Sequence, residues 1–134
     1  MLSDALNGMK AALAAALPAR VVTRDLKNFD QRKDAELQAG VLTLVAAREF
    51  GYANHRGREA DMGRLSLAIV GQIKLPGKPA PSTVEDAEFA FAAEVKTFLA
   101  GALPVSDALL LETRFSGQLE APYGWFAMDV EVRP

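Results

Sequence analysis

The clearest hydrophobic pattern in the chain is an alternation of apolar and polar residues over positions 65–75. One side of an extended strand would carry five apolar residues and the other side three polar ones, namely Leu65, Leu67, Ile69, Ile73 and Leu75 against Ser66, Gln72 and Lys74. The pattern predicts a half-buried strand, which at about 3.3 Å per residue would reach about 36 Å. A strand this long is unusual in a small domain, and an exposed edge is normally covered or paired. We therefore predict a protruding arm and a chain that assembles with other subunits.

Two segments have apolar residues at helical spacing. Residues 4–17 predict an amphipathic helix that stops at Pro18. A second helix is predicted to begin at Ser82, because Ser82-Thr83-Val84-Glu85 matches the capping-box pattern, and to end before Pro104. The apolar stripe of this helix would pack on a sheet and consists of Val84, Ala87, Phe91, Val95, Phe98 and Ala102.

Phe89 does not belong to that stripe. At about 100° per residue it points almost opposite to Phe91, toward the face of the helix that should meet solvent. Two interpretations stay open at this point, a partly exposed aromatic side chain or a contact with another subunit.

Four further segments predict strands from their β-branched or alternating residues, at 20–24, 41–49, 108–116 and 123–133. Residues 25–40 are mostly polar, and we interpret them as a surface connection with one helical turn. The connection over 50–63 is long and would form the tip of a two-strand arm. This order predicts an α+β fold in a single domain spanning residues 1–134. We expect a mostly antiparallel sheet of about four to five strands, two main helices packed on one face, and the protruding arm.

The composition narrows the classes of protein to which this chain can belong. The chain has 134 residues, no cysteine and a net charge of −2. It is therefore long enough to bury a core, offers no disulfide or thiolate chemistry, and has no overall charge that would attract nucleic acid. The apolar run from Ala11 to Leu17 is too short for a signal peptide, and Lys10 directly precedes it. No apolar segment approaches the roughly 20 residues of a membrane span, so we predict no membrane association.

One group of residues in the sequence is a weak candidate for a catalytic or metal-binding site. His55 is the single histidine, and Glu49, Glu59 and Asp61 lie close to it in the sequence. These residues lack the spacing of a metal-binding motif, and pairing of the acids with nearby arginines is the simpler interpretation. The chain also has no phosphate-binding glycine loop and no nucleophile elbow. The sequence therefore predicts no catalytic, cofactor-binding or metal-binding residues, and a protein that is not an enzyme.

Residues 48–64 are locally basic, with four arginines against three acidic residues. One interpretation is a solvated tip of the arm. The other is a contact surface, which a ring of identical subunits would multiply around its axis. As candidate contact residues we select Arg48, His55, Arg56, Arg58, Arg64 and Phe89.

The order of these elements and their pattern of apolar and polar residues resemble those of the tail terminator proteins of long-tailed phages, the minor tail protein U type. The resemblance covers about residues 2–132, and it rests on the first helix, the two-strand arm around a long loop, the capped second helix and the closing strand Gly124-Trp125-Phe126-Ala127-Met128-Asp129-Val130-Glu131-Val132. It implies an α+β fold and a hexameric ring that caps the completed tail tube. Such a ring stops tail polymerisation and forms the head–tail joining surface, and the family has no catalytic residues.

For this chain the resemblance implies a structural protein of a phage or prophage, located in the virion tail and, during assembly, in the host cytoplasm. Its expected partners are other copies of itself, the tail tube protein and a head-completion or connector protein. The free protein is expected to be monomeric in solution if the ring contacts are individually small and need the tube end as a template. The resemblance allows DNA to pass through the ring without sequence-specific binding. Three alternatives stay open: another neck, head-completion or tail component, a protein-binding α+β domain outside phages, and a small enzyme.

Overall fold

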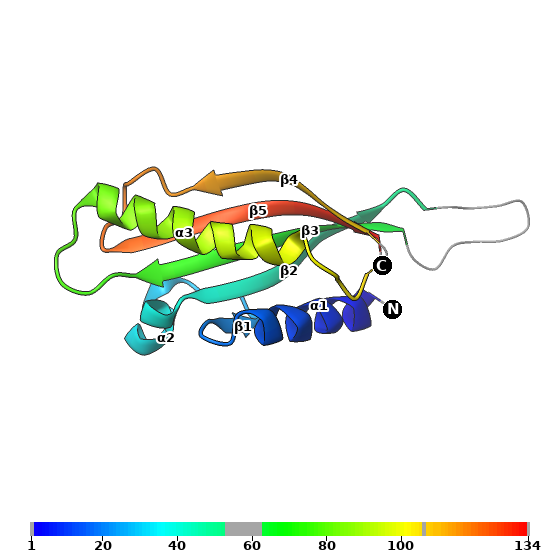
Figure 1. Cartoon of the computed structure of the whole chain (residues 1–134), viewed down its shortest axis with the longest axis horizontal. Helices are drawn as coiled ribbons and strands as arrows, with labels where there is room; N and C mark the ends of the chain where they lie inside the picture. Colours follow the sequence, from blue (N-terminus) through cyan, green and yellow to red (C-terminus); the bar gives the residue numbers. More distant parts are fainter. Residues whose placement is uncertain (1, 53–62, 106, 134) are drawn as a thin grey trace, which may run out of the picture.

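A computed structural model of the protein describes residues 2–52, 63–105 and 107–133. The described residues form one sheet, with the long helices α1 and α3 running along it (Figure 1). In chain order the elements are α1 (Leu2–Ala16), β1 (Val21–Thr23), the 3-10 turn η1 (Phe29–Gln31), α2 (Asp34–Ala39), β2 (Val41–Phe50), β3 (Arg64–Lys74), α3 (Pro81–Leu99), β4 (Asp107–Phe115) and β5 (Tyr123–Arg133).

The strand order in the sheet is β1-β2-β3-β5-β4. Neighbouring strands are antiparallel except β1 and β2, which run parallel. The predicted α+β fold class, with a mostly antiparallel sheet, is confirmed.

The core lies between the helices α1 and α3 and one face of the sheet, here called the inner face. Alternate residues of β3 and β5 point into it, as the period-2 pattern of both strands predicts. The buried cluster consists of Leu6, Met9 and Leu13 from α1, Phe91, Ala92 and Val95 from α3, and Leu42, Leu44, Leu65, Leu67, Ile69, Ile73, Phe126, Met128, Val130 and Val132 from the sheet. Burial of these apolar side chains holds both helices on the inner face.

Gly71 of β3 pairs with Phe126 of β5, and the Phe126 ring lies over it. A Cβ atom at Gly71 would lie 2.2 Å from Cε1 of Phe126, so the ring occupies the space that any other side chain would need. The Phe126 ring also packs edge-on against Phe91 of α3, with ring centroids 5.1 Å apart. Because Gly71 has no side chain, the Phe126 ring of β5 can pack over β3. The same ring also contacts Phe91 of α3.

The opposite face of the sheet, here called the outer face, is covered at one end by the segment between β1 and β2. The Arg32 guanidinium donates to Gln72 Oε1 at 3.0 Å and to Thr43 Oγ1 at 3.3 Å. Leu37 of α2 is fully buried. The expectation of a surface connection over 25–40 is therefore wrong in part. The segment contains the expected helical turn, but it also packs on the sheet and supplies partners for polar side chains that it buries.

The long strand β3 lies inside the sheet. It pairs with β2 from Arg64 to Gln72 and with β5 from Leu65 to Lys74. The expectation that this strand exposes an edge is wrong, because the backbone groups on both of its sides are paired. The tip of the expected arm, residues 53–62, lies outside the described residues. The longer open edge of the sheet belongs to β4.

Helix α3 begins one residue earlier than the sequence pattern predicts. Its first residue is Pro81, its N-cap is Ala80, and no side chain caps this N-terminus. The capping box predicted at Ser82 is therefore wrong. Proline is favoured at the first helical position because its ring presets φ and because it lacks the N–H that would stay unpaired there. The helix ends at Leu99, so Ala102 of the predicted stripe lies beyond it.

Candidate docking surface at one end of the sheet

Three arginines lie on the outer face, at the end of the sheet where β3 begins and β5 finishes. Arg64 is the first residue of β3 and Arg133 the last of β5, and the register of these strands makes the two residues cross-strand neighbours. Arg48 of β2 lies opposite Ser66, two positions further along β3. We call this region the arginine corner, and it consists of Arg48, Arg64 and Arg133 together with Asp107, Leu109 and Glu131.

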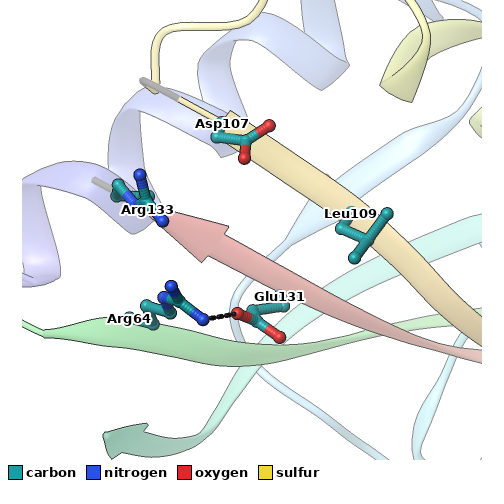
Figure 2. Close-up of a pocket in the computed structure, with 5 residues that line it drawn as sticks. All are labelled: Arg64, Asp107, Leu109, Glu131 and Arg133. Carbon is teal, nitrogen blue, oxygen red and sulfur yellow. Dashed lines mark hydrogen bonds and ion pairs between the residues drawn. The ribbon is translucent and has the colours of Figure 1, made fainter. Parts of the chain in front are cut away.

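An open pocket of about 230 Å³ lies in the arginine corner, lined by Arg64, Asp107, Leu109, Glu131 and Arg133 (Figure 2). Arg64 Nη1 donates to Glu131 Oε1 at 3.1 Å, along the dashed line in Figure 2. Arg133 and Asp107 are partners in the register of β5 and β4. Neither of them makes an ion pair with another residue in the part of the chain that the structure describes. Among the described residues, the pocket therefore holds one arginine with an ion-pair partner, Arg64, and one without, Arg133.

The corner carries three arginines against the two acidic residues Asp107 and Glu131, a small positive excess that can attract an anionic partner. Arg64 and Arg133 place two positive charges side by side, and like charges directly opposite each other on neighbouring strands destabilise a sheet. Glu131 compensates for one of them through an ion pair whose side chains are 46% and 23% exposed. Exposed pairs contribute about 0–1 kcal/mol, so Arg64 can exchange Glu131 for another carboxylate with little loss of stability. The exposed Leu109 beside them adds an apolar contact to this surface.

Next to the arginine corner, Glu49 joins the two ends of the connection between β2 and β3. Its carboxylate accepts hydrogen bonds from the Tyr52 hydroxyl and, at 3.4 Å, from the Gly63 N–H. The hydrogen bond to Glu49 raises the pKa of the Tyr52 phenol. The Arg48 guanidinium lies over the Phe50 ring, 4.4 Å from its centroid. Glu49 is thus engaged by neutral donors, and Arg48 adds an exposed positive charge to the corner.

The structure brings together two of the contact residues selected from the sequence, Arg48 and Arg64. His55, Arg56 and Arg58 lie outside the described residues. Phe89 lies elsewhere, at the far end of β4, where its ring packs edge-on against Phe115 with centroids 4.9 Å apart. It is 46% exposed, which fits the interpretation of a partly exposed aromatic side chain and excludes Phe89 from the arginine corner.

Sequence reasoning did not select Arg133, Glu131, Asp107 and Leu109. The alternation in the last strand places Glu131 and Arg133 on its polar face, and this pattern alone could have marked them as candidate surface residues. What the sequence does not contain is the register that puts Arg133 beside Arg64, because it depends on how the strands pair across the sheet.

The described residues include no group of three or more histidine, cysteine or acidic side chains that could hold a metal ion. None of the helices in the described ranges is both long and apolar enough to cross a membrane. The chain matches no protein family model, and a search of the curated proteins finds no significant match.

Proposed function

We propose that this chain is a structural subunit of a phage or prophage tail, of the tail terminator type. Copies of it would form a ring on the end of the tail tube, stop tube polymerisation and present the surface that joins the tail to the head. Its partners would be other copies of itself, the tail tube protein and a head-completion or connector protein. It would act without catalysis.

The observation that carries this proposal is the arginine corner. Its positive groups come from β2, β3 and β5, so the sheet holds them in fixed relative positions. A closed ring repeats every group around its axis, and a modest local charge becomes a circular basic surface. Such a surface supports docking on an acidic face of a tail or neck protein, with Arg133 available for a new ion pair.

The arrangement of the layers also supports the proposal. Helices α1 and α3 cover only the inner face, and the segment between β1 and β2 covers one end of the outer face. The remaining outer surface includes Leu109, which pairs with Glu131 and is 57% exposed. One face of a ring built from this chain would match the last ring of the tube, and the other would not accept a further tube subunit. Growth would end because the surfaces do not match.

Reversing the charge of the corner tests the proposal. We expect the variant Arg64→Glu/Arg133→Glu to fold normally, because both side chains are exposed, and to bind tube ends about 100-fold more weakly, the size of an interface hot spot. Purified tail tubes are mixed with the wild-type or variant protein, and electron microscopy scores tube length and density at each end. Wild-type protein should give tubes of uniform length with a ring at one end.

The matched control is Lys33→Glu/Lys78→Glu, which makes the same change in net charge at exposed positions near the other end of the sheet. It should cap tubes like the wild type. Tubes that stay bare and keep growing with wild-type protein would overturn the tail terminator assignment. Equal capping by the wild type and by the Arg64→Glu/Arg133→Glu variant would show that the arginine corner does not take part in binding the tube end.

A further inference from the structure

We infer that two copies of this chain pair through the open edge of β4, forming an antiparallel contact between β4 of one copy and β4 of the other. The contact would join the two five-stranded sheets into one continuous sheet. This inference goes beyond the proposed function, because it concerns the free protein and depends on no tail component.

The outer edge of β4 is open to a further strand. β4 is the last of the described strands in the sheet, so no described strand pairs with the other side of its backbone along Asp107–Phe115. Unpaired strand edges are templates for further strand pairing unless they are short, charged or covered. This edge is long, and two of its leucines, Leu109 and Leu111, are 57% and 58% exposed. Both features favour pairing with another strand.

A bulge in β4 makes the strand complementary to a second copy of itself. The register with β5 skips Leu111, since Leu110 pairs with Val130 and Glu112 with Asp129. The extra residue shifts the alternation, so both ends of β4 present their charged residues on the outer face, at Asp107, Glu112 and Arg114. Without it, Asp107 and Arg114 would point to opposite faces.

The bulge also creates a charge pattern that fits a second copy of β4. An antiparallel pair related by a two-fold axis between Leu110 and Leu111 places Asp107 opposite Arg114 of the second copy, and the reverse contact forms by symmetry. Opposite charges on cross-strand neighbours stabilise a sheet. With the described residues of its own chain Arg114 makes two ion pairs, both long, at 3.5 Å with Glu112 and 3.4 Å with Asp129. Its guanidinium can therefore add Asp107 of the second copy.

The same arrangement covers apolar surface. The exposed Leu111 would lie beside the two-fold axis, at the centre of the contact. The exposed Phe89 ring, which packs on Phe115 at the end of β4, would lie next to the start of β4 in the second copy. A contact made by one strand edge is small, and interfaces below about 1,000 Å² are weak or transient, so we expect a concentration-dependent dimer.

A two-fold contact uses the same surface on both copies and closes on itself, whereas neighbours in a cyclic ring meet through two different surfaces. The β4 pair is therefore a separate contact from the ring contact of the proposed function.

Disulfide trapping tests the register directly, because the chain contains no cysteine. In the inferred pair Leu109 lies opposite Glu112 of the second copy. Opposed residues of antiparallel strands have Cα atoms about 4.5–5.5 Å apart, within the range that a disulfide spans. We expect the variant Leu109→Cys/Glu112→Cys to give a cross-linked dimer under mild oxidation, visible on a non-reducing gel.

The controls distinguish this register from random collision. In Leu109→Cys alone, the two cysteines would be about 10 Å apart along the strands, and in Leu109→Cys/Arg114→Cys they would also be out of reach. Both should stay largely monomeric, and circular dichroism checks that all variants are folded. Cross-linking of the controls as fast as that of Leu109→Cys/Glu112→Cys would overturn the inferred pairing.

Sedimentation of the unmodified protein supplies the second test. We expect the dimer fraction to rise with concentration up to about 1 mM, in line with a weak contact. Asp107→Arg and Arg114→Asp should each weaken the dimer about tenfold by placing like charges opposite each other, and the double variant Asp107→Arg/Arg114→Asp should restore it. A wild type that stays monomeric throughout would overturn the inference and leave the tail proposal untouched. Failure of the wild-type protein to cap tail tubes would overturn the tail proposal and leave the inferred β4 dimer untouched.

Discussion

Replacing Gly71 by alanine is expected to lower the free energy of unfolding by about 2 kcal/mol, within the range for overpacked cores. The new methyl carbon would lie 2.2–2.8 Å from carbons of the Phe126 ring, well inside the contact distance. The ring cannot simply move away, because it packs against Phe91 on its other side. Chemical denaturation followed by circular dichroism measures the loss.

Two further variants separate this clash from a general effect of alanine. In the background Phe126→Leu, which removes the ring, the change Gly71→Ala should cost clearly less than in the wild type, as a double-mutant cycle would show. Gly8→Ala should instead stabilise the protein by about 0.5–1 kcal/mol, because Gly8 lies inside α1. The nearest atom to a Cβ there is 3.9 Å away. A Gly71→Ala protein as stable as the wild type would contradict the explanation.

Replacing Glu88 by alanine is expected to lower the free energy of unfolding by about 2–3 kcal/mol, the range for hydrogen bonds to a buried charged group. Glu88 of α3 is 1% exposed. Its Oε2 accepts from Ser116 Oγ at 2.5 Å and its Oε1 accepts from the Ser116 N–H at 3.3 Å. These bonds tie the first half of α3 to the turn after β4. Thermal and chemical denaturation both measure the loss.

Glu88→Gln is the matched variant, because its amide oxygen can accept from the Ser116 N–H and its amide nitrogen can donate to Ser116 Oγ. We expect it to keep most of the stability that Glu88→Ala loses. Ser116→Ala should also destabilise the protein, since the buried carboxylate then loses its hydroxyl donor. If Glu88→Gln were as unstable as Glu88→Ala, the hydrogen-bond account of this contact would be wrong.

Local patterns in the sequence determined the elements and their buried sides. The alternation in 65–75 and 123–133 predicts two strands with one apolar face each, and β3 and β5 bury the residues on those faces. The helical spacing in 4–17 predicts α1 with Leu6 and Met9 facing inward. These predictions hold because side-chain direction follows from backbone geometry alone, with a period of 2 in strands and 3.6 in helices. The α+β class then follows, because each apolar face needs another to cover it.

Only the tertiary structure decided which strand is an edge and which side chains meet. The length of β3 suggested an exposed arm, but β5 returns from the end of the chain to pair along it and leaves β4 at the edge. The same pairing puts Arg133 beside Arg64 and so builds the arginine corner. Glu88 lies at an inward position of α3, and its partner Ser116 is brought to it by the turn between β4 and β5. Strand pairing and such contacts depend on residues far apart in the chain, and local periodicity carries no information about them.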